Sequence, residues 1–310
     1  MAQNPVWLEV ALNGPWARER QPLIPTTEEE VIADGIAYAR AGAAIVHLHA
    51  YDPATGRQRD DAAVYARIIE GIRSAVDAIV YPTVPLAGSV DAPEAGPAET
   101  RYAAVEELAR RGLIEWAVVD PGSTQMSFRA DLGRDREGFV YLNPESHVRH
   151  GLALTARHGL VPSYAIYEPG FLRLGAALAR RVGGVPGPVY RLMFTDDMTF
   201  GYPPAAFALD SYRELLAREA GPGAPWMVAG LGVDVRPLIP LAVAAGGHVR
   251  VGLEDAPLGI ERSNQELVEE IVGRVRAEGL DPADASEVRA ALSRSGSGVA
   301  SASPLTIENR

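Results

Sequence analysis

Eight short apolar runs alternate with helical patterns along this 310-residue chain, and this alternation is the feature that most restricts its fold. Several runs are apolar on consecutive residues, which is typical of strands buried on both faces of a parallel sheet. The expected strands are Trp7–Leu12, Ala43–His49, Ala78–Thr83, Trp116–Val119, Tyr164–Glu168, Tyr190–Phe194, Met227–Ala229 and His248–Gly252. Eight β/α units over this length predict a (β/α)8 TIM barrel of the α/β class, with a doubly wound open sheet as the alternative.

Helical patterns fill the segments between the expected strands. The sequence TTEEE opens the first of them as a capping box would. The clearest helical stretches are Thr27–Ala41, Asp61–Val76, Arg101–Arg111 and Ser211–Ala220. An additional β-like run, Phe139–Leu142, is expected in an excursion after the fourth strand.

The carboxyl-terminal part continues beyond the last expected strand. An amphipathic helix is expected near Ser263–Glu278 and a shorter one near Ala283–Ser293. The residues that follow are small and polar, which is typical of a flexible arm or of a segment ordered against a neighbouring subunit. We therefore predict one barrel domain with carboxyl-terminal helices over residues 1–294 and a flexible or oligomer-contacting tail over residues 295–310.

The composition excludes several kinds of chemistry. The chain has no cysteine and no lysine, so all 29 of its basic residues are arginine. This removes disulfides, thiolate metal sites, cysteine nucleophiles, lysine Schiff bases, pyridoxal phosphate anchoring and the P-loop lysine. An enzyme of this composition that acts on carbon–carbon bonds needs a metal as its electron sink.

Charge and hydropathy restrict the partners. The net charge of −11 argues against a nucleic-acid partner. The sequence has no charged-then-apolar leader and no apolar run of about 18 residues. We therefore expect a cytoplasmic protein that acts on small molecules and has no membrane partner.

Two histidines one residue apart, His47 and His49, close the second expected strand. Side chains at i and i+2 of a strand point to the same face, and two neutral imidazoles suit a divalent transition metal such as zinc. The alternative is two polar residues on a half-buried strand. A second β-like segment, GGHVRVGLED, ends in Glu254 and Asp255, and strand ends of a barrel converge on one mouth. One metal site built from two strand ends would account for both segments.

Other candidate residues lie near these strand ends. Arg250 is expected on the same strand as Glu254, where it needs either Asp255 or a substrate carboxylate as its partner. The alternative for Arg250 is a purely structural ion pair. Asp255 is the candidate base for enolisation, and Arg250 and a bound zinc ion together are expected to lower its pKa.

Two further strand ends offer groups that could bind a carboxylate. Thr83 ends the third expected strand, and Gly122 and Ser123 follow the fourth. A hydroxyl and backbone N–H groups there could hold a carboxylate, with simple turn chemistry as the alternative. His150 and His248 have no such partners nearby and are expected to be structural.

Several segments resemble the β-keto acid cleavage enzyme family. They are NGPW, AGAAIVHLHAYDPATG, DPGSTQMSF, WMVAGLG and GGHVRVGLED followed by SNQELVE, and they span nearly the whole chain in the family's order. The resemblance implies a zinc-binding barrel with His47, His49 and Glu254 as metal ligands and with Arg250 and Asp255 as the residues that flank the glutamate. It also implies condensation of a β-keto acid with acetyl-CoA, which yields acetoacetate and a new acyl-CoA, in a homo-oligomer, namely a tetramer.

The chain departs from the family pattern at three places. Tyr51 stands where an arginine is usual, Trp16 stands where an amine-binding glutamate is usual, and the P-E-x-E signature appears as the segment 162–165, Pro-Ser-Tyr-Ala. We therefore interpret the chain as a divergent member. Trp16 and Tyr51 are expected to line the mouth and to favour a bulkier or less charged acyl group than the one in 3-keto-5-aminohexanoate, the substrate of the best-described member. The alternative for either residue is a packing role.

Two other functions stay open at this point. One is a metal-dependent retro-aldol or retro-Claisen lyase that does not use coenzyme A. The other is a metal-binding barrel that has lost catalysis.

Overall fold

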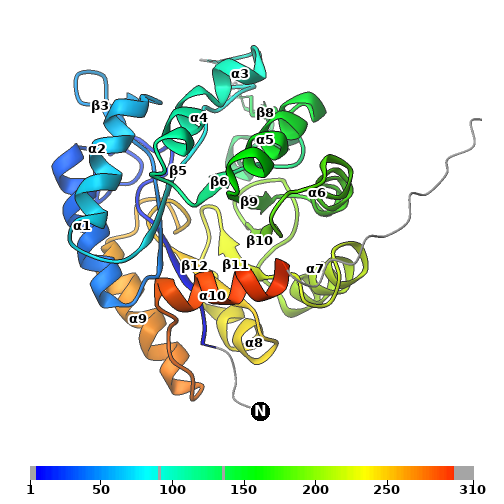
Figure 1. The fold of residues 1–310 in the computed structure, drawn as a ribbon. Helices are drawn as coiled ribbons and strands as arrows, with labels where there is room; N and C mark the ends of the chain where they lie inside the picture. Colours follow the sequence, from blue (N-terminus) through cyan, green and yellow to red (C-terminus); the bar gives the residue numbers. More distant parts are fainter. Residues whose placement is uncertain (1–4, 90–91, 135–136, 297–310) are drawn as a thin grey trace, which may run out of the picture.

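Eight parallel strands form the central sheet of the computed structural model, which describes residues 5–89, 92–134 and 137–296 (Figure 1). The order of the strands is β5-β2-β1-β12-β11-β10-β9-β6, so every neighbour except the pair β1 and β12 is the next or previous strand of this sheet along the chain. The first and last of them, β1 and β12, are hydrogen-bonded, and β5 contacts β6 at the seam. This arrangement confirms the TIM barrel, because a doubly wound sheet would reverse its strand order at a crossover.

All eight expected strands are present, with small differences at their ends. Their bounds are β1 Leu8–Ala11, β2 Ile45–Leu48, β5 Ile79–Pro82, β6 Trp116–Val118, β9 Val161–Ile166, β10 Val189–Phe194, β11 Trp226–Gly230 and β12 His248–Val251. The largest difference is at β9, which begins before the expected Tyr164 and ends before the expected Glu168. Pro162 is tolerated in this strand because pairing with β10 begins only at Ser163.

The barrel is wrapped by helices, most of which the sequence predicts. Thr27 caps α1 (Glu28–Ala41) in a capping box with Glu30, and Asp61 caps α2 (Ala62–Arg73). The expected helix Arg101–Arg111 is two helices, separated at Tyr102, whose buried ring lies against Gly151. The other helices are α3 Ala98–Arg101, α4 Ala103–Arg110, α5 Glu145–His158, α6 Pro169–Val182, α7 Ala206–Glu219, α8 Ile239–Ala244, α9 Asn264–Ala277 and α10 Ala285–Gly296.

Two small hairpins and two 3-10 turns complete the described chain. β3 (Tyr51–Asp52) pairs with β4 (Arg57–Gln58), directly after the second barrel strand. The expected run near Phe139 is β8 (Phe139–Tyr141), which pairs antiparallel with β7 (Thr124–Met126). The 3-10 turns are η1 Arg129–Asp131 and η2 Arg236–Leu238.

The last helix, α10, lies across β11 and β12 in the view of Figure 1. Its residue Arg294 lines a hollow together with Trp7 and Trp226, which start or precede barrel strands, so α10 lies at the amino-terminal end of the barrel. Residues 297–310 of the predicted tail lie outside the described residues. Within the described ranges, no helix combines the length and the apolar character that a membrane span requires.

Candidate metal and substrate site

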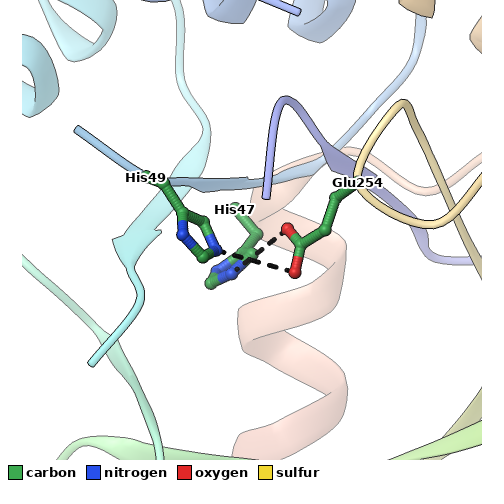
Figure 2. Close-up of side chains that lie close together, drawn as sticks. All are labelled: His47, His49 and Glu254. Carbon is green, nitrogen blue, oxygen red and sulfur yellow. Dashed lines mark ion pairs between the residues drawn. The ribbon is translucent and has the colours of Figure 1, made fainter. Parts of the chain in front are cut away.

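His47, His49 and Glu254 bring their ligand atoms together at the carboxyl-terminal end of the barrel (Figure 2). His47 lies within β2 and His49 directly follows it, and both imidazoles are buried. The Nε2 atom of His47 is 3.5 Å from Oε2 of Glu254, and Nε2 of His49 is 3.6 Å from Oε1. Potential ligand atoms of all three residues lie within 4.8 Å of one another, which is the arrangement that one metal ion needs.

Gln58 sets the tautomer of His49. The side-chain amide of Gln58 donates to Asp60, so its carbonyl oxygen faces Nδ1 of His49 at 2.8 Å. A carbonyl only accepts, so Nδ1 of His49 must carry the proton and donate. The Nε2 atom of His49 therefore presents its lone pair toward Glu254, as a metal ligand must.

A sharp turn places Glu254. We expected Arg250 and Glu254 on one strand, but β12 ends at Val251 and Glu254 lies in the turn after it. Gly252 adopts a φ of 143° at the start of this turn, where a Cβ atom would lie 2.1 Å from the carbonyl oxygen of Ala11. The backbone thus folds back, and Oε1 of Glu254 meets Nη2 of Arg250 at 2.9 Å.

Gly14 supports the same carboxylate from the first loop. It has a φ of 67°, and a Cβ atom there would lie 2.5 Å from Cγ of Glu254. We expect Gly14→Ala to displace Glu254 and to weaken metal binding by at least about tenfold, measured by competition with a chelator. Gly56→Ala is the matched control, because Gly56 has a φ of 66° and no atom within 4 Å of such a Cβ atom. Equal metal affinity in both variants would show that Gly14 does not position Glu254.

Arg250 is the centre of a buried ion network. Its guanidinium donates to both carboxylate oxygens of Asp255, at 2.8 and 2.9 Å, and to Oε1 of Glu9 at 2.9 Å. The Tyr81 hydroxyl also donates to Glu9, at 2.7 Å, and contacts the hydroxyl of Ser163 at 3.1 Å. Ser163 stands where the P-E-x-E signature has its first glutamate, so Glu9 on β1 brings a carboxylate into the network near that position.

The pKa values of the two acids in the turn shift in opposite directions. Burial alone would raise the pKa of Glu254, but Arg250 and the two imidazoles hold it well below its usual range. The pKa of Asp255 is raised to about 6 because burial outweighs the attraction of Arg250. Arg250 alone therefore does not produce the lowering that we expected from Arg250 and zinc together, since the sequence does not show how completely this carboxyl is buried. Glu254 is the permanently charged acid of the pair.

Two features of the site between the imidazoles and Glu254 fit a divalent cation. They are buried atoms without a hydrogen-bond partner and an excess of negative charge. Nε2 of His49 and Oε2 of Glu254 are buried without a hydrogen-bond partner among the described residues, which is costly. The ionisable groups linked to Arg250 and Arg191 include four buried carboxylates, those of Glu9, Asp120, Glu254 and Asp255. Against two guanidinium groups, four carboxylates leave two formal negative charges, which a divalent cation would cancel. Two imidazoles and one carboxylate are a zinc donor set that leaves a coordination position open.

A cavity of about 340 Å³ opens onto these three residues. Arg191 and Asp120 line it together with the imidazoles and Glu254. A second group of lining residues is apolar and comes mostly from the β7–β8 hairpin and the loops around it. These residues are Leu86, Met126, Phe128, Phe139, Met198 and Leu231. The cavity therefore combines a polar region with an apolar region.

Two of the five predicted substrate contacts lie on the cavity wall. Trp16 and Thr83 line the cavity, and the indole N–H of Trp16 donates to the carbonyl oxygen of Glu254 at 2.8 Å. Tyr51 is buried outside the lining, where its hydroxyl contacts the carbonyl oxygens of Gly14 and Trp16. Its observed contacts hold the first loop in place.

Gly122 and Ser123 lie outside the cavity lining and bind Asn143 instead. The Ser123 hydroxyl accepts from the backbone N–H of Asn143 at 2.8 Å, and the Gly122 carbonyl accepts from its side-chain amide at 2.8 Å. The turn chemistry that the sequence left as the alternative accounts for these contacts. Arg250 and Asp255 also lie outside the lining, directly behind Glu254.

Sequence reasoning missed Arg191 and Gln58 as site residues, whereas Asp120 directly follows the fourth expected strand, where barrel active-site residues are expected. Arg191 interrupts the apolar run VYRLMF of β10 in the same way that Arg250 interrupts HVRV of β12. A charged residue inside a buried strand was the signal for Arg191. The position of Gln58 depends on the β3–β4 hairpin. The sequence around this hairpin has no residue pattern that would predict it.

His248 and His150 lie away from this site. His248 stacks on Trp7 at 4.0 Å and accepts its backbone N–H through Nδ1, and burial lowers its pKa to about 3. It lines a hollow of about 710 Å³ at the opposite end of the barrel. His150 is partly exposed and lies near Tyr102 and Glu99. These contacts agree with structural roles for both.

Comparison with known proteins decides the family. The family described as beta-keto acid cleavage enzyme matches residues 5–293. This chain belongs to the β-keto acid cleavage enzyme family. It is accordingly an enzyme of the β-keto acid cleavage and transfer type, as its relatives are named.

Curated relatives of this β-keto acid cleavage enzyme carry different substrate names. The 3-keto-5-aminohexanoate cleavage enzyme of Fusobacterium nucleatum is 28% identical over 89% of this chain and 93% of its own length. The 3-dehydrocarnitine:acetyl-CoA trimethylamine transferase of Rhizobium meliloti is 28% identical over 87% and 89%. The 3,5-dioxohexanoate:acetyl-CoA acetone transferase of Paraburkholderia graminis is 25% identical over 89% and 91%.

A solved structure supports the fold. The binary complex of ObcA with oxaloacetate superposes with a TM-score of 0.66, at 17% identity, over 88% of this chain and 67% of that one. At this identity the likeness concerns the barrel fold.

Proposed function

We propose that this β-keto acid cleavage enzyme binds one zinc ion through His47, His49 and Glu254 and exchanges acyl groups with acetyl-CoA. A β-keto acid R–CO–CH2–COO⁻ and acetyl-CoA would give acetoacetate and R–CO–CoA. The bond between the keto carbon and the CH2 group of the substrate breaks, and the acetyl group takes the place of R–CO. The observation that carries the proposal is the convergence of three ligand atoms at a cavity, in a chain whose relatives are named as acetyl-CoA transferases.

The protein's own residues would prepare this site before substrate enters. A bound zinc ion would polarise the ketone oxygen as a Lewis acid. Gln58 fixes the ring of His49, while Arg250 and Trp16 hold the side chain and the backbone of Glu254. Rigid support of this kind keeps ligands in place without reorganisation during the reaction.

The apolar region of the cavity indicates the acyl group. Phe128, Phe139 and Met198 belong to it, and Trp16 stands beside it. The guanidinium of Arg20 lies over the rings of Phe128 and Trp16, at 4.7 and 5.7 Å from their centroids. A cationic acyl group would be repelled by the Arg20 guanidinium, which already lies over these ring faces, whereas an uncharged group would bury apolar surface. We therefore infer a β-keto acid with an uncharged acyl chain.

We expect 3-keto-5-aminohexanoate to be a poor substrate. Its ammonium group would be buried near the guanidinium of Arg20, and the two carboxylates among the described lining residues, Asp120 and Glu254, already bind Tyr141 and Arg250. The kcat/KM should therefore fall about 100-fold or more below that of 3-oxo-5-methylhexanoate. The methyl compound is the matched control because it replaces the ammonium group by a methyl group of similar size. Equal kcat/KM values for the two acids would contradict the inference.

A screen of β-keto acids tests the proposed reaction itself. Each acid is incubated with metal-loaded protein and acetyl-CoA, and acetoacetate and acyl-CoA are measured. Loss of the acid without consumption of acetyl-CoA would favour the coenzyme-A-independent lyase. No loss of any acid would favour a barrel without catalysis.

Two expectations of the sequence stay predictions. They are assembly into a homo-oligomer, namely a tetramer, and a cytoplasmic location. The oligomeric state is measurable by light scattering of the purified chain.

A further inference from the structure

Arg191 is a buried cation in the wall of the cavity. It lies on β10, is 3% exposed, and lines the same cavity as His47 and Glu254. Its Nη2 atom is 3.4 Å from the carbonyl oxygen of Ser163, whose hydroxyl contacts Tyr81. The Tyr81 ring in turn lies 4.8 Å from the His47 ring, so a short chain of contacts links Arg191 to the candidate metal ligands.

The hydrogen-bonding groups of Arg191 are incompletely used. Its Nε atom is buried and has no partner among the described residues. Its two hydrogen bonds, to Ser163 and to Asp120, are long, at 3.4 and 3.5 Å. A buried guanidinium with unused donors costs free energy, and such an arrangement persists where a ligand completes it.

Asp120 does not fully satisfy Arg191, because closer donors already occupy the carboxylate. The Tyr141 hydroxyl donates to Oδ2 at 2.6 Å, and the backbone N–H of Ala165 donates to Oδ1 at 2.9 Å. The guanidinium of Arg101 shows the contrast. That buried group donates to Pro85, Leu142 and Asn143 at 2.8 to 3.0 Å, and it does not line the cavity.

We propose that Arg191 is the carboxylate-binding residue for the β-keto acid. This inference rests on the proposed function and specifies how the substrate is oriented. A guanidinium with free donors in a cavity suits a carboxylate, because its planar fork matches the two oxygens. The acid group would then bind at Arg191, the keto group near His47, His49 and Glu254, and the acyl chain in the apolar region.

The test compares an acid with its ester. Binding of acetoacetate and of methyl acetoacetate to the metal-loaded protein is measured by calorimetry. The ester keeps the ketone but lacks the charge, so the wild type should bind the acid at least about tenfold more tightly. In Arg191→Met this preference should fall to about threefold or less. Arg191→Lys keeps the charge but not the fork and should show an intermediate preference.

Arg101→Met is the matched control. It also removes a buried guanidinium, but one outside the cavity, so the acid-to-ester preference should match that of the wild type even if stability falls. An unchanged preference in Arg191→Met, or in Arg191→Lys if the methionine variant does not fold, would overturn the inference. So would equal binding of acid and ester by the wild type. Failure of acyl exchange with acetyl-CoA, together with a preference that depends on Arg191, would overturn the proposed function and leave the carboxylate site standing.

Discussion

The His47→Ala and Glu254→Ala variants are expected to lose the bound metal and, with it, turnover. Each removes one of the three proposed metal ligands, and zinc sites with two remaining ligands bind far more weakly. Nothing else among the described residues forms a comparable group of three metal-ligating side chains. Metal content per chain after dialysis, together with acetoacetate formation, measures both effects.

The loss of a metal ligand can be distinguished from unfolding in two ways. Glu254→Ala leaves Arg250 paired with Glu9 and Asp255, so its buried charge keeps partners and the fold should survive. His150→Ala removes a histidine that is distant from the cavity and should keep full metal content and activity. Stoichiometric metal in both His47→Ala and Glu254→Ala would show that these residues are not the ligands.

The barrel could be predicted from the sequence because the pattern that specifies it is repeated. Each strand is a short apolar run, and each is separated from the next by a segment long enough for a helix. The positions of His47 and Glu254 at one mouth then follow from the fold, because parallel strands of a barrel end on the same side. For this reason the residue pattern alone predicts one metal site from two segments that lie far apart in the sequence.

The finer geometry depends on backbone turns that residue patterns do not specify. Glu254 was expected to continue the strand of Arg250 although the apolar run ends at Gly252, because the residue pattern gave no sign that Gly252 turns the chain sharply. Ser123 and Tyr51 were expected to face substrate because they follow strand ends. Loop side chains at those ends can point into the cavity or into the wall, and here the hydroxyls of both bind backbone groups of neighbouring loops.

Asp255 is the second residue at which a substitution should have a large effect. Both of its carboxylate oxygens bind Arg250, which also binds Glu254, so Asp255 is joined to the candidate metal site through one guanidinium. It lies behind the cavity wall, so the predicted role as base for enolisation requires the pair with Arg250 to open when substrate binds. A role limited to positioning Arg250 requires no opening.

Asp255→Asn is expected to keep the metal and the fold and to lose turnover by roughly 10²–10⁴-fold, the usual contribution of a positioned base. If Asp255 removes the α-proton, enzyme-dependent exchange of the CH2 protons of the β-keto acid with deuterium should disappear in the same variant. Retained exchange with weakened metal binding would instead show that the residue only positions Arg250. Arg250→Lys should also fail, because a single ammonium nitrogen cannot reproduce the planar fork that binds both oxygens of Asp255 while it also reaches Glu254 and Glu9. Arg236→Lys, in a partly exposed pair with Asp234, is the matched control and should leave activity intact. Turnover of Asp255→Asn within about threefold of the wild type would contradict both roles.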